Sequence, residues 1–227
     1  MAARRGLLVS TDRMGYSKAW GTQRRLADAR RAGRVPDILW LLEHDSVFTT
    51  GRHGTRADLF LDDAALEAAG ASFVRSDRGG QMTWHGPGQT TGYVIADLRP
   101  GRRLRSFVET LLVAMREASG IDGAQVDTER MGLYVEGRKL GSVGVRVTDG
   151  ITMHGLALNR DPDLGWFETM TACAAPDTPA TSIAAEGGDP RRERVERDLA
   201  AGLAAGLGLA LEPADLEEAI PAGAGRS

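Results

Sequence analysis

The chain has 227 residues, of which 42% are hydrophobic and 26% charged, as expected for a soluble globular protein with a real core. Its formal net charge of −3 gives no global argument for a nucleic acid or an anionic membrane as a partner. No apolar run approaches the roughly 18 residues of a membrane span, and the first apolar run is too short for a signal peptide, so we predict a cytoplasmic protein. The single cysteine, Cys173, excludes an internal disulfide framework and a multi-cysteine zinc site.

The first half of the chain alternates predicted strands and helices, judged by the spacing of its apolar residues. These elements are a strand over 7–10, a helix from 16 to about 33, a strand over 38–42, a short helix over 63–69, strands over 72–75 and 91–98, and a helix from 104 that ends before 120. Asp62 is the predicted N-cap of the short helix and Gly70 its C′ residue.

The basic residues of the first predicted helix form a cluster of five: Arg24, Arg25, Arg30, Arg31 and Arg34. The cluster is either a solvated helix face or a docking surface for an acidic protein.

The second half begins with strands over 133–135 and 143–147, and the turn Asp149-Gly150 predicts a hairpin that returns over 151–159. A two-residue loop places Val145 opposite His154. Lys139 then lies six residues further along the strand, about 20 Å away at about 3.3 Å per residue, so Lys139 and His154 are not predicted to touch.

The remainder predicts a helix over 191–207 with Asp189 as its N-cap, a strand over 209–211 and a helix from 215. No linker or repeat interrupts the chain, so we predict one domain over 1–220 and a flexible tail over 221–227. Strands and helices mix without βαβα regularity, which predicts an α/β (α+β) fold with a mixed sheet flanked by helices.

The stretch Arg78–Gln89 reads RGGQMTWHGPGQ, and Gly and Pro fill five of its twelve positions. It is either a strand between two tight turns, or a wall of backbone N–H groups around a ligand with His85 in reach. It matches neither a phosphate-binding P-loop nor GxGxxG, so ATP is not a predicted substrate.

Two side chains stand out for their chemistry. Of the 28 basic residues only Lys18 and Lys139 are lysines, and a lysine, unlike an arginine, can release and regain a proton. Cys173 is either a buried small side chain or a nucleophile, and a nearby ammonium would lower its pKa. His44 and His53 are expected to be structural or exposed. No ligand spacing predicts a metal site.

Five segments in order resemble the lipoyl(octanoyl) transferase family (octanoyl-[acyl-carrier-protein]:protein N-octanoyltransferase). They are EHDSVFTTGR, RGGQMTWHGPGQ, GRKLGSVGVRV, ITMHGLALN and the Cys173 segment through Thr181-Ser182. The chain departs from the family pattern at Trp84, where Tyr is usual. It also departs at Ala172 and Ala174, which replace the Pro and Gly beside the nucleophile.

The resemblance implies the fold of the biotin and lipoate protein ligase catalytic domain and an acyltransferase activity. It implies that an octanoyl group passes from octanoyl-acyl carrier protein to Cys173 as a thioester, and then to a specific lysine of a lipoyl domain. The implied acceptors are the lipoyl domains of 2-oxoacid dehydrogenase complexes and the glycine cleavage H protein. It implies that Lys139 lowers the pKa of Cys173, and it implies no cofactor, metal, nucleic acid or membrane.

The resemblance also assigns an acyl-binding site. Its residues are Arg78, Gly79, Gly80, Gln81, Met82, Thr83, Trp84 and His85, then Ser142, Val143 and Gly144, then Gly155, Leu156 and Ala157, with His154 as a supporting residue. Two alternatives stay open: an ATP-dependent lipoate or biotin-type ligase on the same fold, and a catalytically silent module that binds acyl carrier protein.

Overall fold

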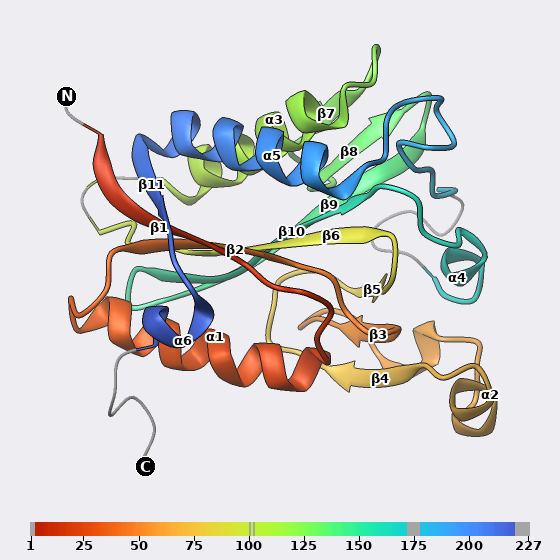
Figure 1. Cartoon of the computed structure of the whole chain (residues 1–227). Coiled ribbons are helices and arrows are strands. Elements are labelled where there is room, and N and C mark those ends of the chain that lie inside the picture. The colour runs from red at the N-terminus through yellow and green to blue at the C-terminus, as the bar shows by residue number, and fades with distance from the viewer. Residues whose placement is uncertain (1–2, 100, 102, 172–177, 221–227) are drawn as a thin grey trace.

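A computed structural model describes residues 3–99, 101, 103–171 and 178–220, and in them the strands form two sheets (Figure 1). The large sheet has the order β11 (Leu209–Pro213), β1 (Arg4–Ser10), β2 (Asp37–Leu42), β6 (Gln89–Ile95), β10 (Ile151–Asn159), β9 (Arg138–Thr148), β8 (Gly132–Val135) and β7 (Gln125–Asp127). The small sheet has the order β4 (Ser72–Arg75), β3 (Val47–Thr50) and β5 (Met82–His85).

Both sheets mix strand directions. In the large sheet β1 is parallel to β11 and β2, whereas the pairs from β2 through β7 are antiparallel. In the small sheet β3 is parallel to β4 and antiparallel to β5. The predicted mixed sheet is therefore confirmed.

Helices cover the large sheet on both faces (Figure 1). The helices are α1 (Tyr16–Arg31), α2 (Asp63–Ala68), α3 (Leu104–Ser119), α4 (Gly165–Glu168), α5 (Arg192–Leu207) and α6 (Leu216–Ala219), with a 3-10 turn over Arg56–Asp58. Helices α3 and α5 pack on one face, while α1, α6 and the small sheet lie on the other (Figure 1). No helix in the described ranges is long and apolar enough to cross a membrane.

Strand β2 shows why its sequence is an unbroken apolar run. Its residues are all buried, because the strand has a hydrophobic layer on each side. Leu39 and Leu41 pack in the core under α3 and α5, whereas Ile38, Trp40 and Leu42 pack in the core under α1.

The hairpin β9–β10 has the predicted register. His154 pairs with Val145 across the hairpin, and the turn residues Asp149 and Gly150 have φ of 51° and 79°. Positive φ at both positions is the requirement of the tight hairpin turn that Asp-Gly favours. Lys139 and His154 are therefore far apart along β9, as predicted.

Asp189 was wrongly predicted as the N-cap of the last long helix. Helix α5 begins at Arg192, and its N-cap is Arg191, which makes no side-chain capping bond. The Asp189 carboxylate instead accepts hydrogen bonds from the backbone N–H of Arg191, at 3.1 Å, and from the Arg191 guanidinium, at 2.6 Å. A local Asx turn takes the side chain that a cap would need.

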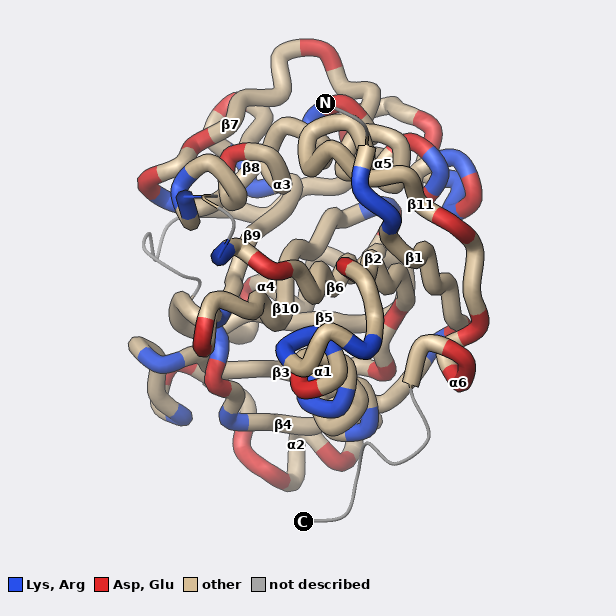
Figure 2. Tube along the Cα trace, turned by 90° about the vertical axis from the view of Figure 1, so that its left-hand side faces the viewer, with Lys and Arg blue, Asp and Glu red and all other residues tan. Residues whose placement is uncertain are grey.

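The basic cluster on α1 is visible in Figure 2 as a run of basic segments along that helix. Three arginines of this cluster contact other side chains of the protein. Arg30 donates to the buried carboxylate of Asp37 at 2.8 Å, and Arg31 pairs with Asp28 at 2.6 Å. Arg24 lies over the ring of Trp20, 4.0 Å from its centroid. Three of the five arginines therefore have partners within the protein, which favours a structural role of this helix face over a docking surface for an acidic protein.

We expect Gly21→Ala, in the middle of α1, to stabilise the protein. A Cβ at Gly21 would meet nothing within 4 Å, and Ala is favoured over Gly in a helix interior by about 0.5–1 kcal/mol. Urea unfolding should show this gain in the free energy of unfolding. The matched control is Gly206→Ala on α5, where the added Cβ would come within 2.5 Å of Thr110 Cγ2, and no gain is expected. Equal gains for both variants would contradict the argument.

Candidate active site

A cavity of about 410 Å³ lies between the large sheet and the small one. This volume is within the range of small-molecule sites. Its lining includes fifteen of the sixteen described residues that the family resemblance placed in the site, and only Trp84 does not line it. The ring of Trp84 instead stacks on Trp166, with centroids 5.8 Å apart, on the face of β5 opposite to Thr83 and His85.

The floor of the cavity is built from three adjacent strands, and β9 and β10 contribute small residues to it. Ser142 of β9 pairs with Ala157 of β10, which pairs with Thr91 of β6. Gly144 likewise pairs with Gly155, which pairs with Tyr93. A Cβ on Gly144 would lie 3.3 Å from the carbonyl oxygen of Gly79, so the missing side chain lets the glycine-rich stretch cross close above the sheet.

The carbonyl groups of residues 78–81 all accept hydrogen bonds from the protein. Gly79 O accepts from Arg78 Nη1 at 2.9 Å, and Gln81 O accepts from Arg78 Nη2 at 2.7 Å. The carbonyls of 78, 80 and 81 also accept backbone N–H groups of 52, 53 and 51 at 3.0–3.2 Å. This set of bonds fixes the shape of the loop over the cavity.

Arg78 itself is a buried cation. It is 6% exposed, and its guanidinium also donates to Thr49 Oγ1 and to Thr49 O, at 2.9 and 2.6 Å. Within the described part of the chain no carboxylate lies within 4.0 Å of it. A buried charge of this kind is costly unless it is fully hydrogen-bonded, and here neutral oxygens supply that bonding. The wall of the cavity therefore carries positive charge.

We expect Gly51→Ala to destabilise the protein by about 1–3 kcal/mol, because overpacking forces backbone to shift. A Cβ at Gly51 would lie 2.3 Å from Gly80 O and 2.9 Å from both Arg78 O and Gly79 O. Urea unfolding measures the loss, and Gly21→Ala, the same change at an open position, is the control. A Gly51→Ala protein as stable as the parent would show that the loop moves freely.

A chain of buried amides fixes the protonation of His85. Gln89 Nε2 lies 3.3 Å from Trp84 O, which can only accept, so Nε2 is the donor of this pair and the Gln89 side-chain oxygen faces the His85 ring. His85 Nδ1 is 2.7 Å from that oxygen and must donate to it. Gln89 Nε2 also donates to Asn159 Oδ1 at 2.9 Å. Burial lowers the pKa of His85 well below its usual value, and the positive charge of Arg78 lowers it further, so the ring is neutral.

His154 is held in an unusual backbone conformation, with φ of 61°. Its Nε2 is 2.8 Å from Asp77 Oδ1, and Arg146 pairs with the other oxygen of Asp77. Burial lowers the pKa of His154 by more than the Asp77 carboxylate raises it. Burial acts to raise the pKa of Asp77, but the hydrogen bond from His154 and the Arg146 guanidinium outweigh it and bring that pKa to about 2.

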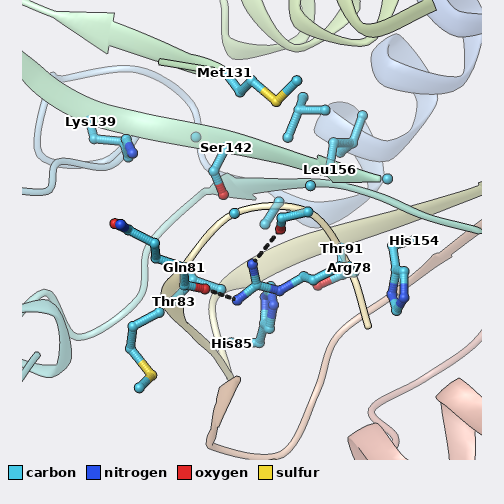
Figure 3. A pocket seen from close by; sticks show the side chains of 18 of the residues that line it. Arg78, Gln81, Thr83, His85, Thr91, Met131, Lys139, Ser142, His154 and Leu156 are labelled. Carbon is cyan, nitrogen blue, oxygen red and sulfur yellow. Dashed lines mark hydrogen bonds between the residues drawn. The ribbon is translucent and has the colours of Figure 1, made fainter. Parts of the chain in front are cut away.

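Lys139 lies at the opposite end of the cavity from His154 (Figure 3). Its Nζ is 5.5 Å from the ring centroid of Tyr134. Its backbone N–H donates to Pro179 O at 2.8 Å, and its carbonyl accepts from Thr181 N at 2.9 Å. Strand β9 thus holds the segment that follows residue 178 beside Lys139.

Cys173, Ala172 and Ala174 lie outside the described residues. Met170 and Thr178, which flank that part of the chain, both line the cavity. The pairing of Cys173 with Lys139 stays a prediction.

The sequence motifs missed several lining residues, among them Tyr16, Thr91 and Tyr93. Gln89, Thr91 and Tyr93 lie on one face of β6, but every residue of this strand is buried, so no alternation of polar and apolar residues marks that face. Tyr16 was predicted only as part of the buried helix face. Its hydroxyl donates to Ser76 Oγ at 3.0 Å, and its ring stacks on His85 at 5.9 Å. His44, predicted to be structural or exposed, is fully buried and bonds to Tyr93 Oη at 2.6 Å.

Residues 15–204 match the family of the lipoyl protein ligase A/B catalytic domain. Among curated relatives, the octanoyltransferase of Alcanivorax borkumensis is 38% identical over 207 residues, which cover 89% of this chain and 81% of the relative. The octanoyltransferase of Synechococcus elongatus is 37% identical and covers 96% of this chain and 94% of its own. The mitochondrial octanoyltransferase LIP2 of Arabidopsis thaliana is 38% identical, over 76% of this chain and 75% of its own.

Solved structures show the same fold at low identity. A lipoate-protein ligase A bound with ATP matches with a TM-score of 0.67 and 16% identity, over 97% of this chain and 93% of that one. The biotin protein ligase of Aquifex aeolicus matches with a TM-score of 0.50 and 11% identity, over 90% and 69%. The predicted ligase-like fold is confirmed. The chain therefore belongs to the lipoyl protein ligase A/B catalytic-domain family and is an enzyme, a transferase of the kind that its octanoyltransferase relatives represent.

Proposed function

We propose that the protein transfers an octanoyl group from octanoyl-acyl carrier protein to a lysine of a lipoyl domain, through a thioester on Cys173. The acceptors would be the lipoyl domains of 2-oxoacid dehydrogenase complexes and the glycine cleavage H protein. One observation carries the proposal: a cavity floored by small residues has Lys139 at one end and is lined by both Met170 and Thr178, which flank the cysteine segment.

The first step exchanges one thioester for another. The Cys173 thiolate attacks the carrier thioester, a new C–S bond forms to Cys173, and the carrier leaves as a thiolate that takes up a proton. The exchange is nearly neutral in free energy. Lys139 would favour the attacking thiolate through its positive charge.

The second step forms the amide. The neutral amine of the acceptor lysine attacks the acyl-enzyme, the C–N bond forms, and the Cys173 sulfur leaves. The attacking nitrogen loses one proton, which Lys139 would relay to the departing sulfur. Conversion of a thioester to an amide drives this step. Backbone N–H groups around the cavity would stabilise the oxyanion in both steps.

The cavity would bind the acyl chain by excluding water from it. Six methylene groups contribute roughly 5 kcal/mol when fully buried, at about 0.8 kcal/mol each. One methylene more or less therefore changes the affinity only a few-fold. Selection of a chain length must come from the closed end of the cavity.

Intact-mass analysis tests the proposal. After mixing with octanoyl-acyl carrier protein, the protein should gain the mass of one octanoyl group, and hydroxylamine should remove it, because hydroxylamine cleaves thioesters. Addition of an apo lipoyl domain should move the group to that domain in a hydroxylamine-resistant form. An unchanged mass would contradict the proposal.

The same assay separates the two alternatives. A protein that uses free octanoate and ATP to modify the lipoyl domain would be a ligase, whose fold this chain shares. A protein that binds octanoyl-acyl carrier protein without gaining mass would be a silent binding module.

A further inference from the structure

The part of the chain that follows the cysteine segment is anchored at Thr181, which is 2% exposed. Its N–H donates to Lys139 O of β9 at 2.9 Å, and its hydroxyl donates to Glu186 Oε1. Its carbonyl accepts from Asn159 Nδ2 of β10, also at 2.9 Å. Thr181 is thus held from two neighbouring strands of the cavity floor, by a main-chain bond from β9 and by a side-chain bond from β10.

The side chain of Asn159 also reaches the glycine-rich stretch. Asn159 pairs with Gln89 across β10 and β6, and its Oδ1 accepts from Gln89 Nε2 at 2.9 Å. The Gln89 oxygen in turn accepts from His85 Nδ1 at 2.7 Å. Asn159 is therefore the junction between the glycine-rich wall of the cavity and the segment that contains Thr181.

The direction of these hydrogen bonds leaves the Asn159 amide one orientation. Thr181 O can only accept, so the amide nitrogen must face it. A flipped amide would place its oxygen against Thr181 O and its nitrogen against the Gln89 nitrogen. Asn159 and Gln89 are 3% and 2% exposed, so bulk water does not replace a bond that is lost, and a broken junction leaves buried groups unpaired.

Thr181 lies beside the end of the cavity at which Lys139 is found. Thr178 and Ala180 line the cavity, and the N–H of Lys139 donates to Pro179 O at 2.8 Å. A shift of this segment would move the wall next to Lys139. It would also move the point to which the cysteine segment is joined.

We propose that Asn159 is a positioning residue for acyl transfer. Its side-chain amide holds Thr181 in register with the glycine-rich wall, so that the cysteine segment starts from a fixed point beside Lys139. Asn159 acts through that segment, because the oxygen and the nitrogen of its amide are both bonded within the protein. The inference deepens the function proposed above and rests on it.

Asn159→Asp tests this role through pH. A protonated carboxyl can donate to Thr181 O and accept from Gln89 Nε2, as the amide does, whereas an ionised carboxylate only accepts and repels Thr181 O. Burial raises the pKa of a carboxyl. The rate of acyl-enzyme formation, relative to the parent, should therefore be highest near pH 5. It should fall by up to about tenfold per pH unit above the pKa of the new carboxyl.

The comparison with the parent at each pH removes the titration of groups that both proteins share. These groups are His85, which lies beyond Gln89, and Lys139 and Glu186, which both contact Thr181. A rate ratio that does not change with pH would overturn the inference.

The matched control is Thr152→Val. Thr152 is fully buried on the same strand and does not line the cavity, and its hydroxyl is bonded to Val94 O and Ala96 N at 2.6 and 2.9 Å. This variant should be less stable than the parent, with a rate ratio that is constant in pH. The same pH dependence in both variants would show a general loss of stability and would overturn the positioning role.

Hydrogen exchange without substrate separates positioning from a charge effect on the reaction. The amide protons of Lys139 and Thr181 are bonded to Pro179 O and Lys139 O. In Asn159→Asp they should exchange like those of the parent near pH 5 and at least about tenfold faster than those of the parent near pH 8. A new charge that leaves the segment in place would not change them. Equal exchange in both proteins near pH 8 would overturn the inference.

The parent protein allows a measurement that needs neither a variant nor activity. Asn159 is the single asparagine of the chain, so asparagine labelled with nitrogen-15 reports this residue alone in NMR spectra. Its amide protons should exchange with water at least about tenfold more slowly than those of a free asparagine side chain, and equal rates would contradict the junction. A parent that takes no octanoyl group would instead count against the proposed function, and the two exchange measurements would still decide the role of Asn159.

Discussion

Cys173→Ser should form no hydroxylamine-labile octanoyl adduct, and its rate of transfer to a lipoyl domain should fall by at least about 10³-fold. Removal of the nucleophile costs covalent enzymes up to on the order of 10⁶-fold in kcat. A serine hydroxyl does not ionise near neutral pH, and one neighbouring ammonium is not enough to change that. Intact mass measures the adduct, and a lipoyl-domain mass shift measures transfer.

The parent chain offers a direct check on this variant. Because Cys173 is the single cysteine, a thiol reagent should label the parent once per chain and the variant not at all. Equal thermal unfolding of both proteins would show that the fold is kept. A labile adduct on the variant would place the acyl group on another residue and end the thioester proposal.

Lys139→Arg should separate charge from proton transfer. Arginine keeps the positive charge but does not release a proton at working pH, so acyl-enzyme formation should slow only a few-fold. Transfer to the acceptor amine should fall about 10²–10⁴-fold, the usual contribution of general acid–base catalysis. Single-turnover mass analysis resolves the two steps.

Two further variants test this interpretation: Lys139→Met removes the charge, and Lys18→Arg is a control at the other lysine. Lys139→Met should also slow alkylation of Cys173 at pH 7, because the pKa of the thiol returns toward about 8.5. Lys18→Arg changes the other lysine, which is exposed on α1, and should leave both steps as in the parent. Full transfer activity in Lys139→Arg would show that the site needs only the charge.

The hydrophobic pattern was enough to predict most of the fold. The unbroken apolar run of β2 and the Asp149-Gly150 turn each lead to one structure, because a strand buried on both faces and a hairpin turn with positive φ at both positions have few alternatives. The prediction of Asp189 as an N-cap was wrong because an Asp side chain suits both a helix cap and an Asx turn. Its local hydrogen bond with Arg191 selects the Asx turn.

The residues that line the cavity were predicted less completely than the fold. Contiguous motifs located the walls, but a contiguous motif on a strand includes residues of both faces, so Trp84 was counted with His85 although it packs against Trp166. Thr91 and Tyr93 were missed for a related reason. Strand β6 is buried on both faces, so no pattern of polar and apolar residues shows which side chains meet the cavity.

The β9–β10 hairpin sets the depth of the cavity by residue count. Lys139 and His154 both belong to this pair of strands, whose backbones are hydrogen-bonded from Gly141–Leu158 to the turn. Loop movement elsewhere cannot bring these residues closer together. A change in the separation of these two residues along the hairpin therefore requires a pair of residues to be deleted from or inserted into both strands at once, since a single insertion would turn the following side chains to the wrong face. That separation should therefore change in discrete steps.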